Sequence, residues 1–274
     1  MESSNLSDAP DDQAALTPGI SAVDEDEAAR DEATVQLQSS LTDLAGLVSH
    51  AFSLEELLGK VATFAVNAIP GAQGAGVTLL RTGHPHTRVE ALAASHPFVA
   101  DIDELQYATL GEGPCITAAL EQRTVRSGSL GGDKQWPRFG PRVGRLGVHS
   151  VLSLPLLQPD EVVGAINVYA REKDAFDDSA VHMGEQFAVP AAVAVHNAQV
   201  LAHAVALAAQ LQTALASRPV IDQAIGILRS RHGETADQAF ARLRTLSQHE
   251  HRKLVDVAEA LVEQAAARAR ARRS

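Results

Sequence analysis

Apolar residues in the first part of the chain recur with the period of a helix and then with that of a strand. From residue 35 to 66 they fall at three- and four-residue steps, and the pattern divides at Ser53, which is placed to cap a second amphipathic helix. Residues 75–80 and 88–94 are rich in strand-forming residues and are separated by the turn-forming sequence TGHPH. This region therefore predicts two helices followed by a β-hairpin.

The middle of the chain has no sustained period. Between residues 110 and 148 it contains the sequences GEGP, GG and WPRFGPR, which predict loops and short helices around a cavity. Two strand-like segments follow, 150–157 and 162–170, and the second is apolar on both faces, as expected of a central strand. Together these elements predict an α+β domain with an antiparallel sheet flanked by helices.

A long alanine-rich helix is expected to begin at Asp177 or Asp178 and to end near Ala216. Its apolar residues form an a/d seam over about four heptads, typical of a coiled-coil-like linker helix. The seam fits either a parallel homodimer or a helix that packs on its own sheet. Pro190 favours the second for the first turns, and we favour the dimer for the helix as a whole. The seam consists of Phe187, Ala191, Ala194, Ala198, Leu201, Val205, Ala208 and Leu215.

Three short helices are predicted to close the chain as an all-α three-helix bundle. Ser217 is placed to cap the first, with Pro219 in its first turn, and Thr235 with Gln238 forms a capping box for the second. Ser247 is placed to cap the third. The apolar stripes expected to form the small core are Ile221, Ala224, Ile225, Leu228, Ala239, Phe240, Leu243, Leu246, Leu254, Val257, Ala258 and Leu261.

Composition places the chain among soluble globular proteins. Its 274 residues are enough for two domains and a tail, with 45% hydrophobic and 21% charged residues. No segment has the unbroken apolar length of a membrane span, and the first residues do not resemble a secretory signal. The single cysteine, Cys115, excludes an internal disulfide. We therefore expect a cytoplasmic protein that does not enter a membrane.

The net charge of −11 is distributed unevenly. Residues 1–33 have a net charge of −9 and no apolar period, which predicts a disordered acidic tail over residues 1–34. Residues 211–274 have a net charge of +4. A basic end in an acidic chain fits binding to a phosphate backbone, and it fits a solvated helix surface nearly as well.

The C-terminal region resembles the ANTAR family of RNA-binding antiterminators over residues 217–262, whose sequence is SRPVIDQAIGILRSRHGETADQAFARLRTLSQHEHRKLVDVAEALV. The preceding part resembles a GAF domain of the kind found beside ANTAR domains in actinobacteria. The sequences that carry this second resemblance are AGVTLL, LGEGPC, WPRFGPR, SVLSLPLL, VVGAINVYA and AFDD. The expected order is an acidic tail (1–34), a GAF sensor domain (35–200), a linker and dimerisation helix (178–216), an ANTAR domain (211–267) and a basic tail (268–274).

The resemblance implies a transcription antitermination regulator. Members of the ANTAR family bind paired small stem-loops in messenger RNA leaders, and this prevents a terminator hairpin from forming. A regulatory event at the N-terminal domain controls dimerisation or exposure of the RNA-binding surface. The sequence departs from the family at two positions: Arg229 stands where methionine is common, and His251 stands where asparagine is common.

RNA binding requires cations for phosphates and stacking groups for loop bases. We expect Arg244 and Lys253 to contribute most, followed by Arg252, although each also fits a solvated surface charge. Phe240 is assigned to the core, so stacking would fall to guanidinium groups or histidines. The candidate RNA-binding residues are Arg218, Arg229, Arg231, Arg242, Arg244, Arg252 and Lys253.

The GAF region is expected to hold an unknown small-molecule effector between its sheet and residues 110–148. Candidate lining residues are Cys115, Trp136 and Arg138, although the first two also fit structural roles in a packed loop and a core. Cys115 is followed by Ile116 and not by the histidine of a bilin site, and it has no companion cysteine for methionine sulfoxide reduction. The 11 histidines are scattered, so we expect no metal site and no cofactor.

These observations favour a ligand-gated RNA-binding antiterminator. The alternative is a signalling interaction module in which the C-terminal bundle docks on a protein partner. An enzyme is not expected, because no Ser-His-Asp order, nucleotide-binding loop or paired carboxylates emerge, and no receiver domain with an acidic phosphorylation pocket is present in the sequence.

Overall fold

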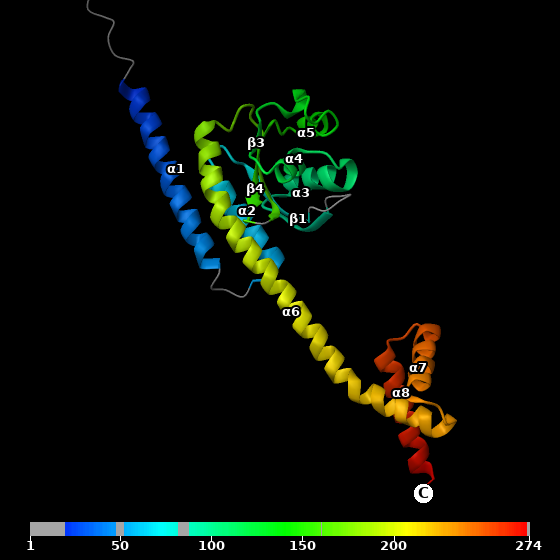
Figure 1. Ribbon diagram of the computed structural model, residues 1–274. Coiled ribbons are helices and arrows are strands. Elements are labelled where there is room, and N and C mark those ends of the chain that lie inside the picture. Colours follow the sequence, from blue (N-terminus) through cyan, green and yellow to red (C-terminus); the bar gives the residue numbers. More distant parts are fainter. Residues whose placement is uncertain (1–19, 48–51, 82–87, 160, 273–274) are drawn as a thin grey trace, which may run out of the picture. The chain divides into compact units, whose positions relative to one another are not determined.

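The computed structural model describes residues 20–47, 52–81, 88–159 and 161–272. They form two compact units that divide between Gln199 and Val200. The first unit contains the sheet, and the second is helical (Figure 1). Residues 1–19 of the expected acidic tail and the TGHPH turn of the expected hairpin lie outside the described residues.

The N-terminal unit is built on an antiparallel sheet with the strand order β2-β1-β5-β4-β3. The expected hairpin is confirmed as β1 and β2, and the expected central strand is confirmed as β5, which is buried along its whole length. The sequence did not reveal β3, because three residues are too few to show an alternating pattern. The strands are β1 (Gly74–Arg81), β2 (Arg88–Ala94), β3 (Val125–Ser127), β4 (Ser150–Leu157) and β5 (Val162–Ala170).

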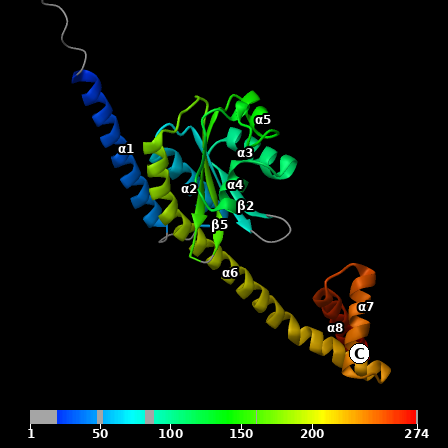
Figure 2. The same ribbon diagram turned by 45° about the horizontal axis from the view of Figure 1, so that its top comes forward.

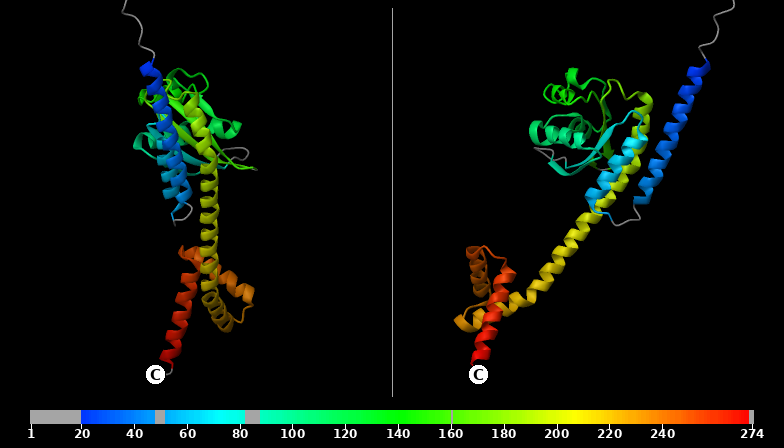
Figure 3. Two further views of the ribbon diagram at one scale, coloured as in Figure 1. Left: turned by 90° about the vertical axis from the view of Figure 1, so that its left-hand side faces the viewer. Right: turned by 180° about the vertical axis from the view of Figure 1, so that it is seen from behind.

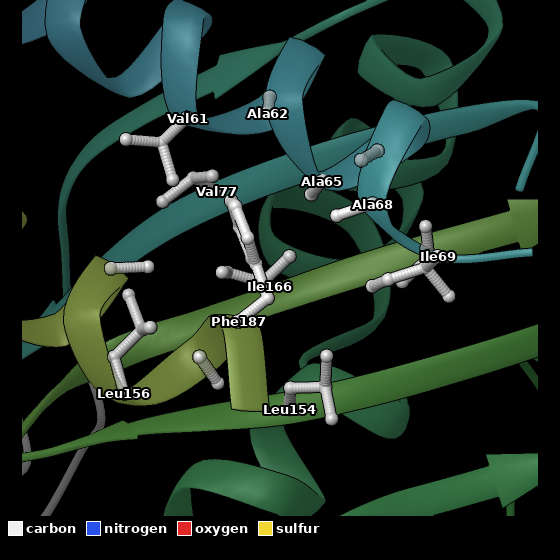
Figure 4. Close-up of a cluster of buried hydrophobic side chains, with 14 of the residues drawn as sticks. Val61, Ala62, Ala65, Ala68, Ile69, Val77, Leu154, Leu156, Ile166 and Phe187 are labelled. Atoms are coloured by element: carbon white, nitrogen blue, oxygen red, sulfur yellow. The ribbon is translucent and has the colours of Figure 1, made fainter. Parts of the chain in front are cut away.

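One face of the sheet is covered by α2 (Leu54–Ala68) and the first turns of α6 (Asp178–His232), and α1 (Ile20–Leu47) packs on the outer side of α2 (Figure 1, Figure 3). Figure 4 shows Val61 and Ala65 of α2 and Phe187 of α6 against Val77 and Ile166 of the sheet. The expected cap at the start of α2 is confirmed, because the Ser53 side chain accepts a hydrogen bond from the Glu56 amide and the Glu56 side chain accepts one from the Ser53 amide.

The other face is covered by shorter elements, which confirms the expectation of loops and short helices for residues 110–148 (Figure 2). Their core contains Trp136, Phe139, Val143 and Tyr169. The elements are α3 (Pro97–Asp103), the π-helical segment η1 (Glu104–Leu110), α4 (Pro114–Glu121), the short 3₁₀ turn η2 (Leu130–Gly132) and α5 (Gly140–Arg145).

The prediction of disorder was wrong for residues 20–34, which form the first half of α1. This segment is rich in alanine and glutamate, which are strong helix formers. The helix is anchored further along by Leu37, Leu44 and Leu47, which are buried. A helix that extends from an anchored end needs no apolar period along its whole length, which is why the sequence did not reveal this part of α1.

The predicted break before the C-terminal bundle was also wrong, because α6 continues without interruption through Ser217 and Pro219 to His232. A proline inside a helix removes one hydrogen bond and costs about 3 kcal/mol. Good helix formers precede it, and Ala224 and Leu228 after it are buried in the core of the second unit, so the helical conformation prevails on both sides.

The seam of α6 combines the two arrangements that the sequence left open. Phe187, Ala191 and Ala194 are buried against the sheet of the N-terminal unit, as Pro190 suggested for the first turns. Leu201, Val205 and Leu215 are exposed. Only the second half of the seam is therefore available to a partner helix.

Of the described helices, α6 is the one long and apolar enough, by length and composition, to cross a membrane, which the sequence analysis did not anticipate. A core helix of a soluble protein passes the same test, and the first turns of α6 do contribute to a core. This finding is therefore weak evidence for a membrane span.

The C-terminal unit consists of the end of α6, α7 (Ala236–Glu250) and α8 (Leu254–Ala271), with a core of Ala224, Leu228, Ala239, Leu243, Val257 and Ala258. The Thr235–Gln238 capping box is confirmed. Ser247 does not cap the third helix. It lies in the last turn of α7, where its hydroxyl donates to the Arg252 carbonyl at 2.6 Å. Lys253 is the N-cap of α8, without a side-chain capping bond.

His251 ends α7 in the left-handed region, with φ 55° and ψ 34°. This region is unfavourable for most L-residues, but asparagine and histidine enter it more often than others. The departure from the asparagine common in the family therefore preserves the backbone conformation required at the end of α7.

The close approach of β5 to β1 makes glycine necessary at position 164. A Cβ atom at Gly164 would lie 2.0 Å from the Thr78 carbonyl oxygen, whereas one at Gly59 of α2 would meet nothing within 4 Å. We expect Gly164→Ala to lower the free energy of unfolding of the N-terminal unit by about 2 kcal/mol or more. Gly59→Ala, the control, should raise it by up to about 1 kcal/mol. Urea unfolding followed by the fluorescence of Trp136, the single tryptophan, measures both.

Candidate RNA-binding surface and sensory site

The seven candidate RNA-binding cations are all exposed, but three of them have partners. Arg218 lies 4.0 Å from Asp222, and Arg252 lies 3.1 Å from Glu250. Arg242 forms a close ion pair with Glu234, and its hydrogen bonds lower the pKa of that carboxyl. These three side chains would have to exchange a carboxylate for a phosphate in order to bind RNA.

The other four, Arg229, Arg231, Arg244 and Lys253, form no ion pair with any residue in the described part of the chain. They do not share one surface. Arg229 and Arg231 are two residues apart on α6 and so point to different sides of the helix. Arg231 lines a groove of about 410 Å³ between α6 and α8, together with Gln223, Ile227 and Val262.

The exposed face of α7 carries a group that the sequence analysis assigned to the core. Phe240 is 41% exposed, so its placement in the core was wrong. It forms a stripe with Arg244 and Gln248, which follow at helical spacing and are both exposed. We name these three residues the α7 stripe. The sequence did not reveal this exposure, because Phe240 is three residues before Leu243 and therefore lies beside the buried face formed by Ala239 and Leu243.

Polar side chains are buried in the N-terminal unit on the face of the sheet opposite α2. Each is at most 1% exposed, and we name them the buried polar cluster. Ser153 donates to the Asn167 side-chain oxygen at 2.6 Å, and the Cys115 amide donates to the Gln106 side-chain oxygen at 3.2 Å. The members of the cluster are Thr78, Asp103, Gln106, Cys115, Ser153, Asn167 and Tyr169.

Several polar atoms of this cluster have no hydrogen-bond partner. They are both carboxyl oxygens of Asp103, the side-chain nitrogens of Gln106 and Asn167, and the hydroxyl of Tyr169. Burial raises the pKa of Asp103 to about 7. Burial, and then the negative charge of Asp103, raise the pKa of Tyr169 well above its usual value, so these two side chains are within electrostatic reach of each other.

The sequence-predicted ligand residues are not brought together. Cys115 lies in the buried polar cluster. Trp136 lies in the adjacent apolar core, where its ring nitrogen donates to the Thr117 hydroxyl at 3.0 Å, and Arg138 is exposed. The residues that the sequence analysis missed are Asp103, Gln106 and Tyr169. An asparagine at position 167, inside an otherwise apolar strand, was the available signal for a polar site on this face.

Family comparison identifies both units. Residues 51–196 match the model of the GAF domain, and residues 209–262 match the model of the ANTAR domain. The chain belongs to the GAF family and carries a C-terminal ANTAR domain. This confirms the GAF domain and the ANTAR domain that the sequence resembles. No protein of curated function matches the chain.

Similar solved structures align with the GAF part. The GAF domain of a phosphoenolpyruvate-protein phosphotransferase from Coxiella burnetii is 16% identical, with coverage of 61% of this chain and 96% of that one and a TM-score of 0.46. The corresponding domain from Acinetobacter is 13% identical, with coverage of 61% and 97% and a TM-score of 0.45. A free methionine-R-sulfoxide reductase from Neisseria meningitidis is 15% identical, with coverage of 60% and 91% and a TM-score of 0.44.

The two domains define the general role of the chain. The ANTAR domain implies RNA-binding antitermination regulation, the GAF domain implies a sensory function, and both are regulatory domains. Among the described residues, no group of three or more histidine, cysteine, aspartate or glutamate side chains is arranged to hold a metal ion.

The unpartnered carboxyl in the GAF domain has a consequence for stability. Asp103 keeps its proton in the folded chain up to about pH 7 but loses it in the unfolded chain near its ordinary value of 3.8. The free energy of unfolding therefore falls as pH rises from about 4 to 7, and the contribution of Asp103 is constant above that.

We expect Asp103→Asn to remove the fall in the free energy of unfolding that ionisation of Asp103 causes as the pH rises. The difference in free energy of unfolding between the variant and the wild type should grow in favour of the variant by on the order of 3 kcal/mol from pH 5 to pH 8. Asp101→Asn, an exposed change two residues earlier on α3, is the control and should follow the wild type. Urea unfolding with Trp136 fluorescence at the two pH values gives the comparison, and parallel behaviour of all three proteins would contradict the assignment.

Proposed function

We propose that the chain is a cytoplasmic, homodimeric transcription antiterminator in which a small molecule bound by the GAF domain controls binding of the ANTAR domain to paired RNA stem-loops. The observation that carries the proposal is the combination of an ANTAR domain with the exposed α7 stripe and four cations that have no ion-pair partner in the described chain. The GAF match supports the sensory part.

The α7 stripe has the chemistry needed to recognise RNA loops. The major groove of A-form RNA is too narrow for side chains, so proteins recognise unpaired bases by stacking and by hydrogen bonds. Phe240 offers an aromatic face, and Arg244 one turn later offers a guanidinium plane. Gln248 adds amide donors and acceptors. Lys253 and Arg229, on neighbouring elements, are available for phosphates.

The exposed half of the α6 seam supports self-association. Leu201, Val205 and Leu215 are each more than 60% exposed, and they continue an a/d pattern that two parallel helices would bury. A two-fold dimer presents two copies of the same binding surface, which suits an RNA target made of two similar stem-loops.

A route for regulation is provided by the continuity of α6. Its first turns contribute Phe187 to the GAF core, and its last turns contribute Leu228 to the ANTAR core. A ligand that shifts the packing of the GAF domain can therefore act on the helix that carries the dimer seam. A catalytic role for Cys115 is not favoured, because burial raises the pKa of its thiol to about 12 and keeps it protonated.

The proposal is tested by sequencing RNA that co-purifies with the intact chain and by electrophoretic titration with a paired-hairpin leader RNA found in this way. Lys253→Glu should abolish the shift at moderate salt, because it replaces an exposed cation with an anion. Arg123→Glu makes the same charge change in the GAF domain, and this control variant should still shift the RNA. Failure of the intact chain to prefer hairpin RNA over another polyanion would favour the alternative of a protein-docking module.

Phe240 is expected to stack on a base. Phe240→Leu keeps an apolar side chain but removes the ring, and we expect it to weaken hairpin binding by about tenfold. Phe240→Tyr keeps the ring and should bind nearly as well as the wild type. The same titration measures both variants, and circular dichroism checks that the helices are intact. Equal affinity of the Leu and Tyr variants would exclude stacking.

The dimer seam is expected to tolerate no charge. Val205→Asp places a carboxylate within the exposed apolar row and should convert a two-chain species into a single chain. Gln210→Asp, on the opposite side of α6, makes a comparable change outside the seam and should leave the dimer intact. Sedimentation equilibrium gives the mass of each protein. A monomeric wild type would refute the proposed dimer.

A further inference from the structure

Two glycines make room for the unpartnered groups of the buried polar cluster. A Cβ atom at Gly76 of β1 would lie 2.8 Å from a carboxyl oxygen of Asp103, and one at Gly113 would overlap the side-chain oxygen of Gln106. A residue larger than glycine at position 76 or 113 would therefore collide with the side chain of Asp103 or Gln106. Asp103 lies at the end of α3 and Gln106 in the π-helical segment η1, an irregularity often found at functional sites.

Tyr169 lies over the same part of the sheet. In the antiparallel pairing of β1 with β5, Gly76 is opposite Asn167 and Gly74 is opposite Tyr169. Gly74, Gly76, Asn167 and Tyr169 thus share one face of the two strands, because alternate residues point to the same side. The patch beneath Asp103 consequently combines an unpaired carboxyl with the unpaired hydroxyl of Tyr169.

The unpartnered atoms of the buried polar cluster indicate which hydrogen-bonding groups a ligand must carry to satisfy them. A buried carboxylate needs a cation or N–H donors, and leaving it without them is costly. The Gln106 and Asn167 side-chain nitrogens are donors that need acceptor oxygens, and the Tyr169 hydroxyl can donate or accept. Sequence-distant elements converge to form this set, and nothing in the described chain satisfies it.

We propose that the buried polar cluster is the anchoring end of the GAF ligand site and that its ligand is a compact organic cation bearing N–H groups, such as an amine or amidine, next to an acceptor oxygen. The carboxylate of Asp103 receives the N–H groups, and Gln106 donates to the oxygen. This inference rests on the sensory role proposed above and specifies the chemical class of the effector.

The probe for the carboxylate is acetamidinium, whose two N–H groups match a carboxylate. Thermal unfolding of the intact chain at pH 8, followed by Trp136 fluorescence, reports on the GAF domain alone because this is the only tryptophan. We expect saturating acetamidinium to raise the midpoint by about 3 °C. Tetramethylammonium, a cation without N–H groups, and acetate, an anion of similar size, should not raise it at equal ionic strength.

Asp103→Asn should abolish the response to acetamidinium, and the control Asp101→Asn should retain it. At pH 5.5, where the Asp103 carboxyl is protonated, the wild type should respond less than at pH 8, a comparison that does not depend on the folding of any variant. An equal shift with tetramethylammonium, an unchanged response in Asp103→Asn, or no response to acetamidinium would overturn the inference.

Hairpin RNA binding of the same protein preparations separates this inference from the proposed function. A chain that binds hairpin RNA but does not respond to acetamidinium would refute the ligand class and leave the antiterminator proposal intact. A chain that responds to acetamidinium but does not bind hairpin RNA would refute the antiterminator proposal and support the cation site.

Discussion

Burial of β5 on both faces is the constraint on which the GAF domain depends. A strand with no exposed residue requires a helical layer on each side of the sheet, and α2 and α6 supply one while α3 to α5 supply the other (Figure 2). The two layers differ in chemistry. The first face of the sheet is apolar, whereas the second includes Asn167 and Tyr169. The same strand therefore stabilises the fold and provides the floor of the buried polar cluster.

The second feature that links structure to function is the changing role of α6 along its length. Its first turns have a buried apolar face, its middle has an exposed one, and its last turns again contribute to a core. A helix that completes two cores and leaves an apolar row between them can join sensing to self-association without any additional element. The helix continues through Pro219 because favourable residues on both sides outweigh one missing hydrogen bond.

The ANTAR domain has a core too small to hide all its apolar residues. Six small or medium side chains are buried, and the largest candidate, Phe240, is left on the surface beside Arg244. The exposed ring is therefore available for the stacking on a base that the proposed function assigns to it. Arg218, Arg242 and Arg252 form ion pairs with carboxylates, so fewer of the candidate cations can bind a phosphate without first breaking an ion pair.

Local patterns in the sequence were sufficient for α2, the four longer strands, the central position of β5, the caps at Ser53 and Thr235, and both domain families. Each depends on residues close together in the chain, whose hydrogen bonds and periodicity can be recognised without knowing the fold. Only the tertiary structure decided that residues 20–34 are helical, that α6 is unbroken, that Phe240 faces outward, and that Asp103, Gln106 and Tyr169 share one buried patch. These outcomes depend on anchoring, burial and neighbours contributed by distant segments, which no local period records.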